Sequence, residues 1–310
     1  FTGLTILLIP FVCTFFLYGT RLQPEIIPPA WLNFLTAASV MIYLTLDNAD
    51  GKQARKTGNS STLGMILDHG CDCLVTGVIV VIACHVMQIS TPLASIMVFL
   101  GGFVFFAKIM EQLATKKMTL GIINPVDEGL PAISLLLIVF GIIGNSVWTK
   151  ESVVWSFSWR ELCIYSLAIV TFFFTFASLY EVLKIKSFLW VLKCLFMFIF
   201  VLGGCAGLLL TDFAPAFAEP KYLFLFFIVL QARICTGIMM SHVQDAEPHF
   251  ILFYPMFFAS VMYIICGVAK NIPSTVESLS IIYKVTCAVA VVCRLTRLHH
   301  VHHFPVQLLS

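Results

Sequence analysis

Long apolar runs follow one another along almost the whole sequence, separated only by short polar breaks. A run of about 20 apolar residues is long enough to cross the hydrocarbon core of a membrane as a helix. Hydrophobic residues make up 60% of the chain and charged residues only 11%, against roughly a quarter charged in a soluble domain. The sequence therefore predicts an all-α polytopic membrane protein and excludes secreted, cytosolic and disordered chains.

The polar and Pro/Gly breaks divide the chain into about ten spans by this length criterion. Because the runs are unbroken, we expect helices rather than a β-barrel, the two structures that satisfy their backbone in lipid. The expected spans are 1–18, 30–47, 71–90, 93–111, 126–146, 160–182, 187–211, 221–243, 249–268 and 278–298. The first run has no basic leader and no small-residue cleavage site, so we interpret it as a membrane helix rather than a signal peptide. Since the chain opens at Phe1, we expect the true amino terminus to lie upstream.

The basic residues set the expected orientation in the membrane. An even number of spans puts both chain ends on one face, and ten Lys and Arg residues fall on that face against six on the other. Cytosolic connections carry the excess of Lys and Arg, so the face with ten is predicted to be cytosolic. The formal net charge of +2 offers no broad basic field for a polyanion, and no nucleic-acid partner is expected.

Four aspartates flank the connection between the second and third spans. Asp47 and Asp50 end one span, and Asp68 and Asp72 begin the next, at spacings that put each pair on one helix face. Carboxylates at membrane depth are costly and usually mark a functional site. Four oxygen donors without His or Cys suit a hard cation such as Mg²⁺ or Mn²⁺, not zinc. The alternative, in which these acids are merely solvated helix ends, stays open at this point.

Small and basic residues accompany the aspartates. Gly51, Ala54 and Gly64 let a nucleotide or a backbone approach closely, and Arg55 can hold a phosphate bidentately. Residues 47–72 read DNADGKQARKTGNSSTLGMILDHGCD. This stretch resembles the signature of the CDP-alcohol phosphotransferase family, D-x2-D-G-x2-A-R-x8-G-x3-D-x3-D, at all eight fixed positions. The GKQAR and DHGCD runs are similar to the eukaryotic choline/ethanolamine phosphotransferase branch.

The resemblance implies one membrane domain over residues 1–310, with 47–72 as its catalytic motif. It implies a homodimer that works at the cytosolic face of the endoplasmic reticulum or Golgi membrane. Such an enzyme transfers phosphocholine or phosphoethanolamine from CDP-choline or CDP-ethanolamine to diacylglycerol and releases CMP. By the same resemblance the four aspartates hold two Mg²⁺ ions, with Mn²⁺ as an alternative, while Arg55 holds a phosphate and Gly51 leaves room for the cytidine.

His69 matches the histidine proposed in this branch as the base that accepts the proton of the diacylglycerol hydroxyl. Histidine changes protonation near neutral pH, which suits general-base work. The branch usually reads GELFDH before and at this position, but here Met65 stands in place of the Glu, and its side chain can neither accept a proton nor orient an imidazole. Either another acid fills that role, with Glu128 as the best candidate, or His69 is a weaker base. An acid at a helix start such as Glu128 is also favoured by the helix dipole alone.

Other classes of membrane protein also carry acidic residues within their membrane helices. An ion-coupled transporter would explain acids in the membrane, but we find no inverted repeat of the kind such proteins show. An intramembrane prenyltransferase would carry its two Asp-rich motifs far apart, whereas both acid pairs here lie in one hairpin. A relative with another alcohol specificity, or one without activity, stays open. Arg233, within a span, needs a polar partner, and we interpret His299, His300, His302 and His303 as a hydrated helix end.

Overall fold

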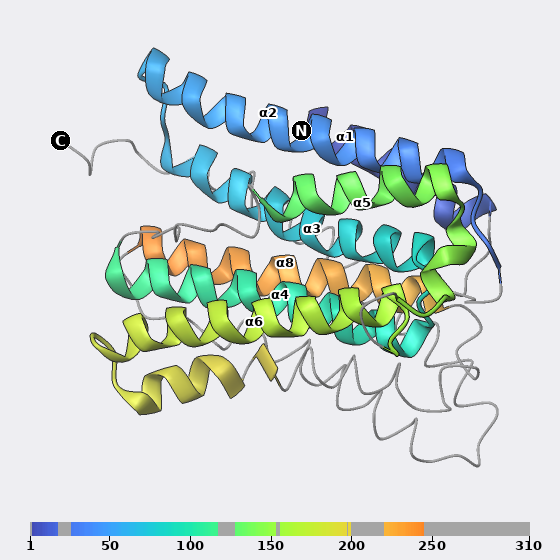
Figure 1. The fold of residues 1–310 in the computed structure, drawn as a ribbon. Helices are drawn as coiled ribbons and strands as arrows, with labels where there is room; N and C mark the ends of the chain where they lie inside the picture. The colour runs from blue at the N-terminus through green and yellow to red at the C-terminus, as the bar shows by residue number, and fades with distance from the viewer. Residues whose placement is uncertain are drawn as a thin grey trace, which may run out of the picture.

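The computed structural model describes residues 2–17, 26–116, 128–152, 156–196, 198–199 and 220–244. Within these residues the chain is helical apart from its turns and one isolated β-bridge between Glu151 and Ser158. The elements are α1 (Thr2–Leu17), α2 (Ala30–Thr57), α3 (Thr62–Val86), α4 (Thr91–Thr115), α5 (Gly129–Ile143), the 3₁₀-helix η1 (Asn145–Thr149), α6 (Trp159–Leu183) and α8 (Pro220–Val243). A short helical segment follows α6 at 188–196. The all-α prediction is confirmed for the described part of the chain (Figure 1).

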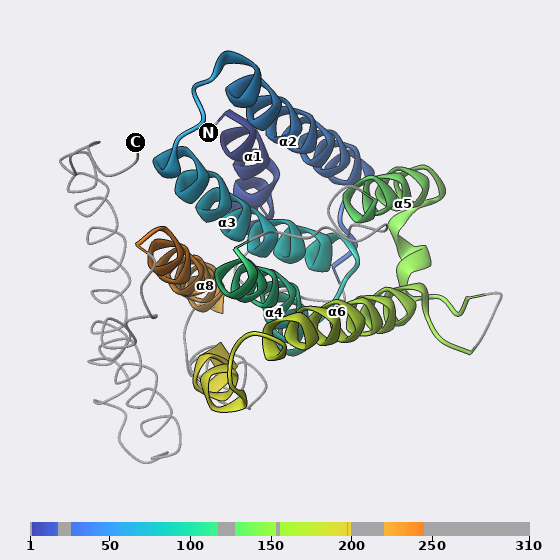
Figure 2. The ribbon, with the colours of Figure 1, turned by 90° about the vertical axis from the view of Figure 1, so that its left-hand side faces the viewer.

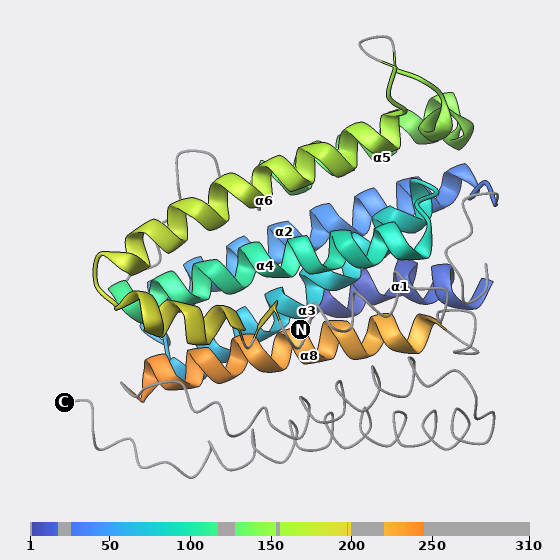
Figure 3. The same ribbon diagram turned by 90° about the horizontal axis from the view of Figure 1, so that it is seen from below.

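Helix α3 lies in the middle of the bundle. It packs against α1 and α2 on one side and against α4 and α8 on the other, as the end-on view shows (Figure 2). Helix α5 extends the bundle beside α2, and α6 extends it beside α4. The long helices run roughly along one common direction (Figure 3). The α3 half of the aspartate-bearing hairpin therefore lies in the middle of the bundle, with α2 beside it toward the edge.

Four of these helices, α2, α3, α4 and α6, are long and apolar enough to cross a membrane. Helices α1, α5 and α8 lie where the sequence predicts the spans 1–18, 126–146 and 221–243. The span expected at 187–211 is described only in part, and those at 249–268 and 278–298 lie outside the described residues, as do the four histidines of 299–303. The described helices agree with a polytopic membrane protein, and the number ten stays a prediction.

The two aspartate-bearing helices extend beyond the spans expected for them. Helix α2 continues to Thr57 instead of ending near residue 47, and α3 begins at Thr62 instead of residue 71. Gly58 ends α2 with a φ of 68°, a left-handed conformation that glycine adopts without steric cost. A rule based on bilayer thickness counts apolar residues and so misses polar helical turns that continue past them. These extra turns carry Arg55 and the start of the motif's second half.

A buried polar network ties the helices together at the opposite end of the bundle. The amides of Asn33 in α2 and Asn145 in η1 bond to each other, with N···O distances of 2.7 and 2.9 Å. The side-chain amide of Asn145 also donates to the carbonyl of Pro28 at 2.6 Å. The backbone carbonyl of Asn145 accepts from the side-chain amide of Gln88 at 2.7 Å. Arg160 of α6 donates to the carbonyl of Gln88 at 3.0 Å. The network thus joins the ends of α2, α3, α5 and α6.

Replacing Asn145 by Ala is expected to lower the free energy of unfolding by about 1–3 kcal/mol, because it leaves the Asn33 amide and the Pro28 carbonyl buried without this partner. The measurement is the thermal midpoint of the purified protein in detergent. Ser146→Ala is the matched control, since Ser146 is the next residue and is exposed. Equal midpoints for the two variants would contradict a stabilising role for the network.

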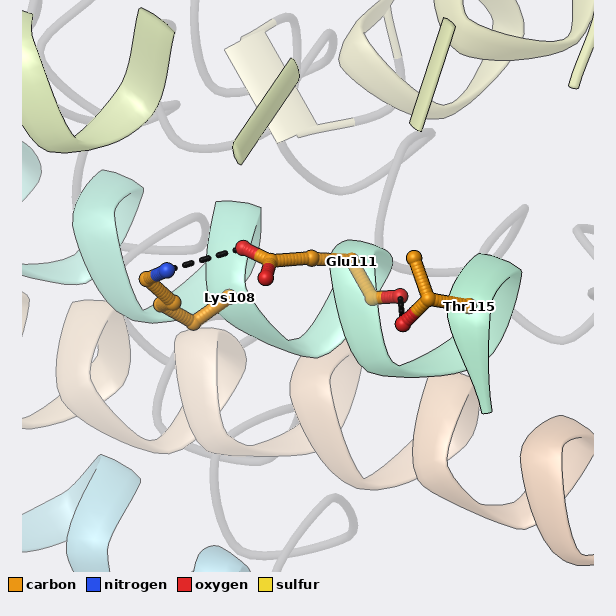
Figure 4. Close-up of polar contacts among 3 residues, drawn as sticks. All are labelled: Lys108, Glu111 and Thr115. Carbon is orange, nitrogen blue, oxygen red and sulfur yellow. Dashed lines mark hydrogen bonds and ion pairs between the residues drawn. The ribbon is translucent and has the colours of Figure 1, made fainter. Parts of the chain in front are cut away.

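Helix α4 carries a charged pair inside the bundle. Lys108 donates to the Glu111 carboxylate at 2.8 Å, and the side chain of Glu111 is only 1% exposed (Figure 4). One turn further on, the Thr115 hydroxyl donates to the backbone carbonyl of Glu111 at 2.8 Å. Spacings of three and four residues on a helix bring such groups together. Pairing explains how a carboxylate is accommodated at this depth.

Candidate active site

The candidate site is built on the hairpin of α2 and α3. Gly58 follows the last residue of α2, and Ser61 precedes the first residue of α3, so the connection is short. The Ser61 hydroxyl accepts a hydrogen bond from the backbone N–H of Gly64 at 3.0 Å, which caps the first turn of α3. The hairpin thereby holds the two halves of the motif side by side on antiparallel helices (Figure 1).

Three of the four predicted aspartates converge. Asp47 of α2 and Asp68 and Asp72 of α3 offer carboxylate oxygens that all lie within 4.8 Å of one another. Asp50 is not a member of this cluster, but it lines the same cavity about one helical turn further along α2. The predicted spacing of Asp68 and Asp72 on one helix face explains why both point the same way.

The cluster fits a divalent cation. Each member offers a carboxylate oxygen, and Asp47 and Asp72 are half-buried, so their mutual repulsion is poorly screened by water. A bound cation would remove that repulsion. Among the described residues the cluster contains neither His nor Cys, and an all-oxygen donor set of this kind suits Mg²⁺ or Mn²⁺.

Tyr43 is a member of this site that the sequence motif does not predict. Its hydroxyl donates to Oδ1 of Asp72 at 2.5 Å and lies 3.4 Å from Oδ1 of Asp47. The ring is buried, with 6% of the residue exposed. Tyr43 precedes Asp47 by four residues, so helical spacing is the signal that could have placed it on the same face.

A cavity of about 660 Å³ opens beside the cluster, a size in the range of small-molecule sites. It lies among α1, α2 and α3. Its lining includes Thr2, Gly3 and Leu4 from the first turn of α1. It also includes eight of the residues that the sequence predicts for the site: Asp47, Asp50, Gly51, Ala54, Arg55, Gly64, Asp68 and His69. The folded chain thus brings the motif residues around one space.

The small residues of the motif leave room at defined places. A Cβ on Gly51 would lie 3.4 Å from Nη1 of Arg55, so the guanidinium lies along the helix face that Gly51 leaves open. A Cβ on Gly64 would meet only the Ser61 hydroxyl, at 3.2 Å. Because neither glycine has a side chain, both leave space in the cavity, as expected for a site that admits a bulky ligand.

His69 is oriented by the backbone. Its Nδ1 lies 2.9 Å from the carbonyl oxygen of Met65, one turn earlier in α3. A carbonyl can only accept, so Nδ1 carries the proton in this bond, and in the neutral imidazole Nε2 is then the nitrogen with the lone pair. The side chain of Met65 takes no part in this bond. Its sulfur lies 3.8 Å from the side-chain amide nitrogen (Nε2) of Gln112. The side chain of Met65 therefore does not orient the imidazole, but the backbone carbonyl of the same residue does.

Glu128 lies elsewhere. It is exposed and directly precedes the first residue of α5, and it is not among the residues that line the cavity. Its side chain makes no hydrogen bond that caps α5. Its role as the partner of His69 stays a prediction. Arg233 lies in α8 and is half-buried.

Comparison with known proteins points to one family. The sequence model of the CDP-alcohol phosphatidyltransferase family matches residues 1–202. Cholinephosphotransferase 1 of Gallus gallus is 35% identical over 122 residues, 39% of this chain and 36% of the relative. Choline/ethanolaminephosphotransferase 1 of Arabidopsis thaliana is 29% identical over 211 residues, 61% of this chain and 52% of the relative. A class-I family protein of Dictyostelium discoideum is 26% identical over 265 residues, 84% of this chain and 64% of the relative.

These matches cover parts of longer proteins. The chain spans 31%, 64%, 36% and 52% of the length of four curated relatives that it matches. The family match includes both halves of the 47–72 motif and all of the helices that surround the cavity.

Proposed function

Because the chain belongs to the CDP-alcohol phosphatidyltransferase family, we propose that it transfers phosphocholine, phosphoethanolamine or both from the CDP carrier to diacylglycerol and releases CMP. The family makes the chain a transferase of phospholipid synthesis. The choice of alcohol and of acceptor is our proposal, and it is supported by the names of the relatives from Gallus gallus and Arabidopsis thaliana.

One observation carries the proposal: three carboxylates from one hairpin converge beside a cavity that Arg55 and His69 also line. A bare ion site would need only the carboxylates. A nucleotide diphosphate needs in addition a positively charged side chain to hold its phosphates, and Arg55 supplies it. It also needs space for a bulky ligand, which Gly51 and Gly64 leave because they have no side chains. The same cavity therefore offers groups for the diphosphate and for proton transfer.

The residues divide the chemistry between them. Mg²⁺ or Mn²⁺ held by Asp47, Asp68 and Asp72, with a second ion and Asp50 as the resemblance implies, would supply the charge that neutralises the diphosphate and the leaving CMP. Arg55 would bind a phosphate oxygen and fix the direction of the diphosphate.

His69 would act on the acceptor. Its Nε2 accepts the proton of the diacylglycerol hydroxyl while the hydroxyl oxygen forms a bond to the phosphorus that carries choline or ethanolamine. The bond between that phosphorus and the oxygen bridging to CMP breaks, and CMP leaves with the bonding electron pair. The carbonyl of Met65, which accepts from Nδ1 at 2.9 Å, would stabilise the imidazolium that forms. Glu128 remains proposed as a further partner of His69.

The setting of the enzyme is also a proposal. We place the cavity at the cytosolic face of the endoplasmic reticulum or Golgi membrane, where the excess of Lys and Arg puts the α2–α3 turn. We propose that the enzyme is a homodimer, as the family resemblance implies. Diacylglycerol is confined to the bilayer, so it would reach the cavity from between the helices rather than from water.

The test is a direct assay of the reaction. Purified protein in lipid nanodiscs is supplied with diacylglycerol, Mg²⁺ and either CDP-choline or CDP-ethanolamine, and both CMP and the phospholipid product are measured. We expect CMP and the phospholipid product to form in equal amounts. Competition between CDP-choline and CDP-ethanolamine identifies the preferred CDP-alcohol. Release of CMP only with another acceptor alcohol would favour a different specificity. No CMP with any CDP-alcohol, but cation uptake in sealed vesicles, would support the transporter instead.

A further inference from the structure

Tyr43 contacts two members of the carboxylate cluster at once. Its hydroxyl lies 2.5 Å from Oδ1 of Asp72 and 3.4 Å from Oδ1 of Asp47. A phenol has one proton to donate, so the short bond to Asp72 takes it and the longer contact to Asp47 is the weaker one. These two carboxylates come from different helices, and the Tyr43 hydroxyl contacts both.

The Tyr43 ring is held in place from the other side. It is buried, with 6% of the residue exposed, and the first turn of α1 packs on it. A Cβ on Gly3 would lie 3.1 Å from Cδ2 of the ring and 3.4 Å from the Tyr43 Cα. Because Gly3 has no side chain, α1 packs directly against the Tyr43 ring, and little space remains for the ring to rotate.

The bond to Asp72 leaves one side of that carboxylate for another partner. Oδ1 of Asp72 accepts from the phenol, which leaves Oδ2 as the oxygen available to an ion. Asp47, Asp68 and Asp72 each offer a carboxylate oxygen within 4.8 Å of the others. Metal-binding carboxylates are commonly fixed in this way by a hydrogen bond to the oxygen that does not bind the ion. Without the bond, repulsion among three close anions would favour turning the Asp72 side chain away.

We propose that Tyr43 is a positioning residue of the divalent-cation site. The packing of α1 at Gly3 holds the Tyr43 ring, and the Tyr43 hydroxyl orients the Asp72 carboxylate toward the ion. This inference rests on the cation site of the proposed function. It links α1 to the chemistry, because the helix that lines the cavity with Thr2, Gly3 and Leu4 also fixes a residue behind the cluster.

The direct test is Tyr43→Phe, which removes the hydroxyl and keeps the ring. Binding of Mn²⁺ is measured by electron paramagnetic resonance on the purified protein in nanodiscs, with no nucleotide or lipid substrate. We expect the affinity to fall about 10–100-fold, the usual effect of removing a residue that supports a metal ligand. Tyr165→Phe is the matched control, because Tyr165 is exposed on α6 and does not line the cavity. Its Mn²⁺ affinity should equal that of the unaltered protein.

A second variant perturbs the ring without removing the hydroxyl. In Gly3→Val the new side chain meets the Tyr43 ring, and we expect a loss of Mn²⁺ affinity in the same direction. This variant carries the test if Tyr43→Phe does not fold. Unchanged Mn²⁺ affinity in the folded variants, with only a lower thermal midpoint, would overturn the inference and leave Tyr43 a packing residue. Since the titration needs no CDP-alcohol, its outcome is independent of whether the unaltered protein releases CMP.

Discussion

Replacing Asp68 by Ala is expected to lower the rate of CMP release by more than about 10³-fold, because charge stabilisation by a bound metal is worth several kcal/mol in a transition state. Asp68 belongs to the converging cluster and also lines the cavity. The Asp68 carboxylate would face both the ion and the substrate. Loss of this carboxylate therefore removes a metal ligand next to the diphosphate that reacts. The measurement is CMP formation from CDP-choline and CDP-ethanolamine at saturating diacylglycerol.

Two companion variants separate charge from folding. Asp68→Asn keeps the size of the side chain and an oxygen but loses the charge, and we expect a loss of rate nearly as large as for Ala. Glu181→Ala is the matched control, since Glu181 is an exposed acid on α6 whose ion pair with Lys184 (2.6 Å) lies at the surface, and it should keep the full rate. Substantial activity in a folded Asp68→Ala protein would contradict the assignment of the cluster to the metal.

The cation cluster could be predicted from sequence because its geometry is local. Asp68 and Asp72 lie four residues apart on one helix, and a short turn fixes their partner Asp47 opposite them. Tyr43 obeys the same rule, being four residues before Asp47, but it cannot be predicted in this way because an isolated tyrosine in an apolar span carries no signal of its own. The separation of Asp50 from the cluster depends on the rotation of α2 against α3, which spacing alone does not determine.

Features that join distant segments could not be read from the sequence. The pair of Asn33 and Asn145 links positions 112 residues apart, and neither residue stands in a recognisable pattern. The bond from His69 to the Met65 carbonyl was missed for another reason: the sequence shows which side chain is absent, but every residue keeps its backbone acceptor. The packing of α8 against α3 and α4 likewise follows from the tertiary fold and not from local periodicity.

Replacing His69 by Ala is expected to lower the rate of phospholipid formation by about 10²–10⁴-fold, the usual contribution of a general base. The binding of the CDP-alcohol should stay nearly unchanged, because the groups assigned to the diphosphate are Arg55 and the aspartates. The imidazole is oriented through Nδ1 by the Met65 carbonyl at 2.9 Å, which leaves Nε2 to take the proton. The measurement is kcat with nucleotide affinity determined separately, so that a chemical defect is distinguished from a binding defect.

The loss in His69→Ala should have the character of a missing base. Added imidazole is small enough to enter a cavity of about 660 Å³ and is expected to restore part of the rate, with a dependence on pH that follows the fraction of neutral imidazole. Met65→Leu is the informative companion, because it removes the sulfur and keeps the backbone carbonyl, so the rate should change little. If His69→Ala is fully active, the proton leaves by another route and the assignment of the base is wrong; if Met65→Leu is as slow as His69→Ala, the side chain of Met65 has a role that its backbone bond does not explain.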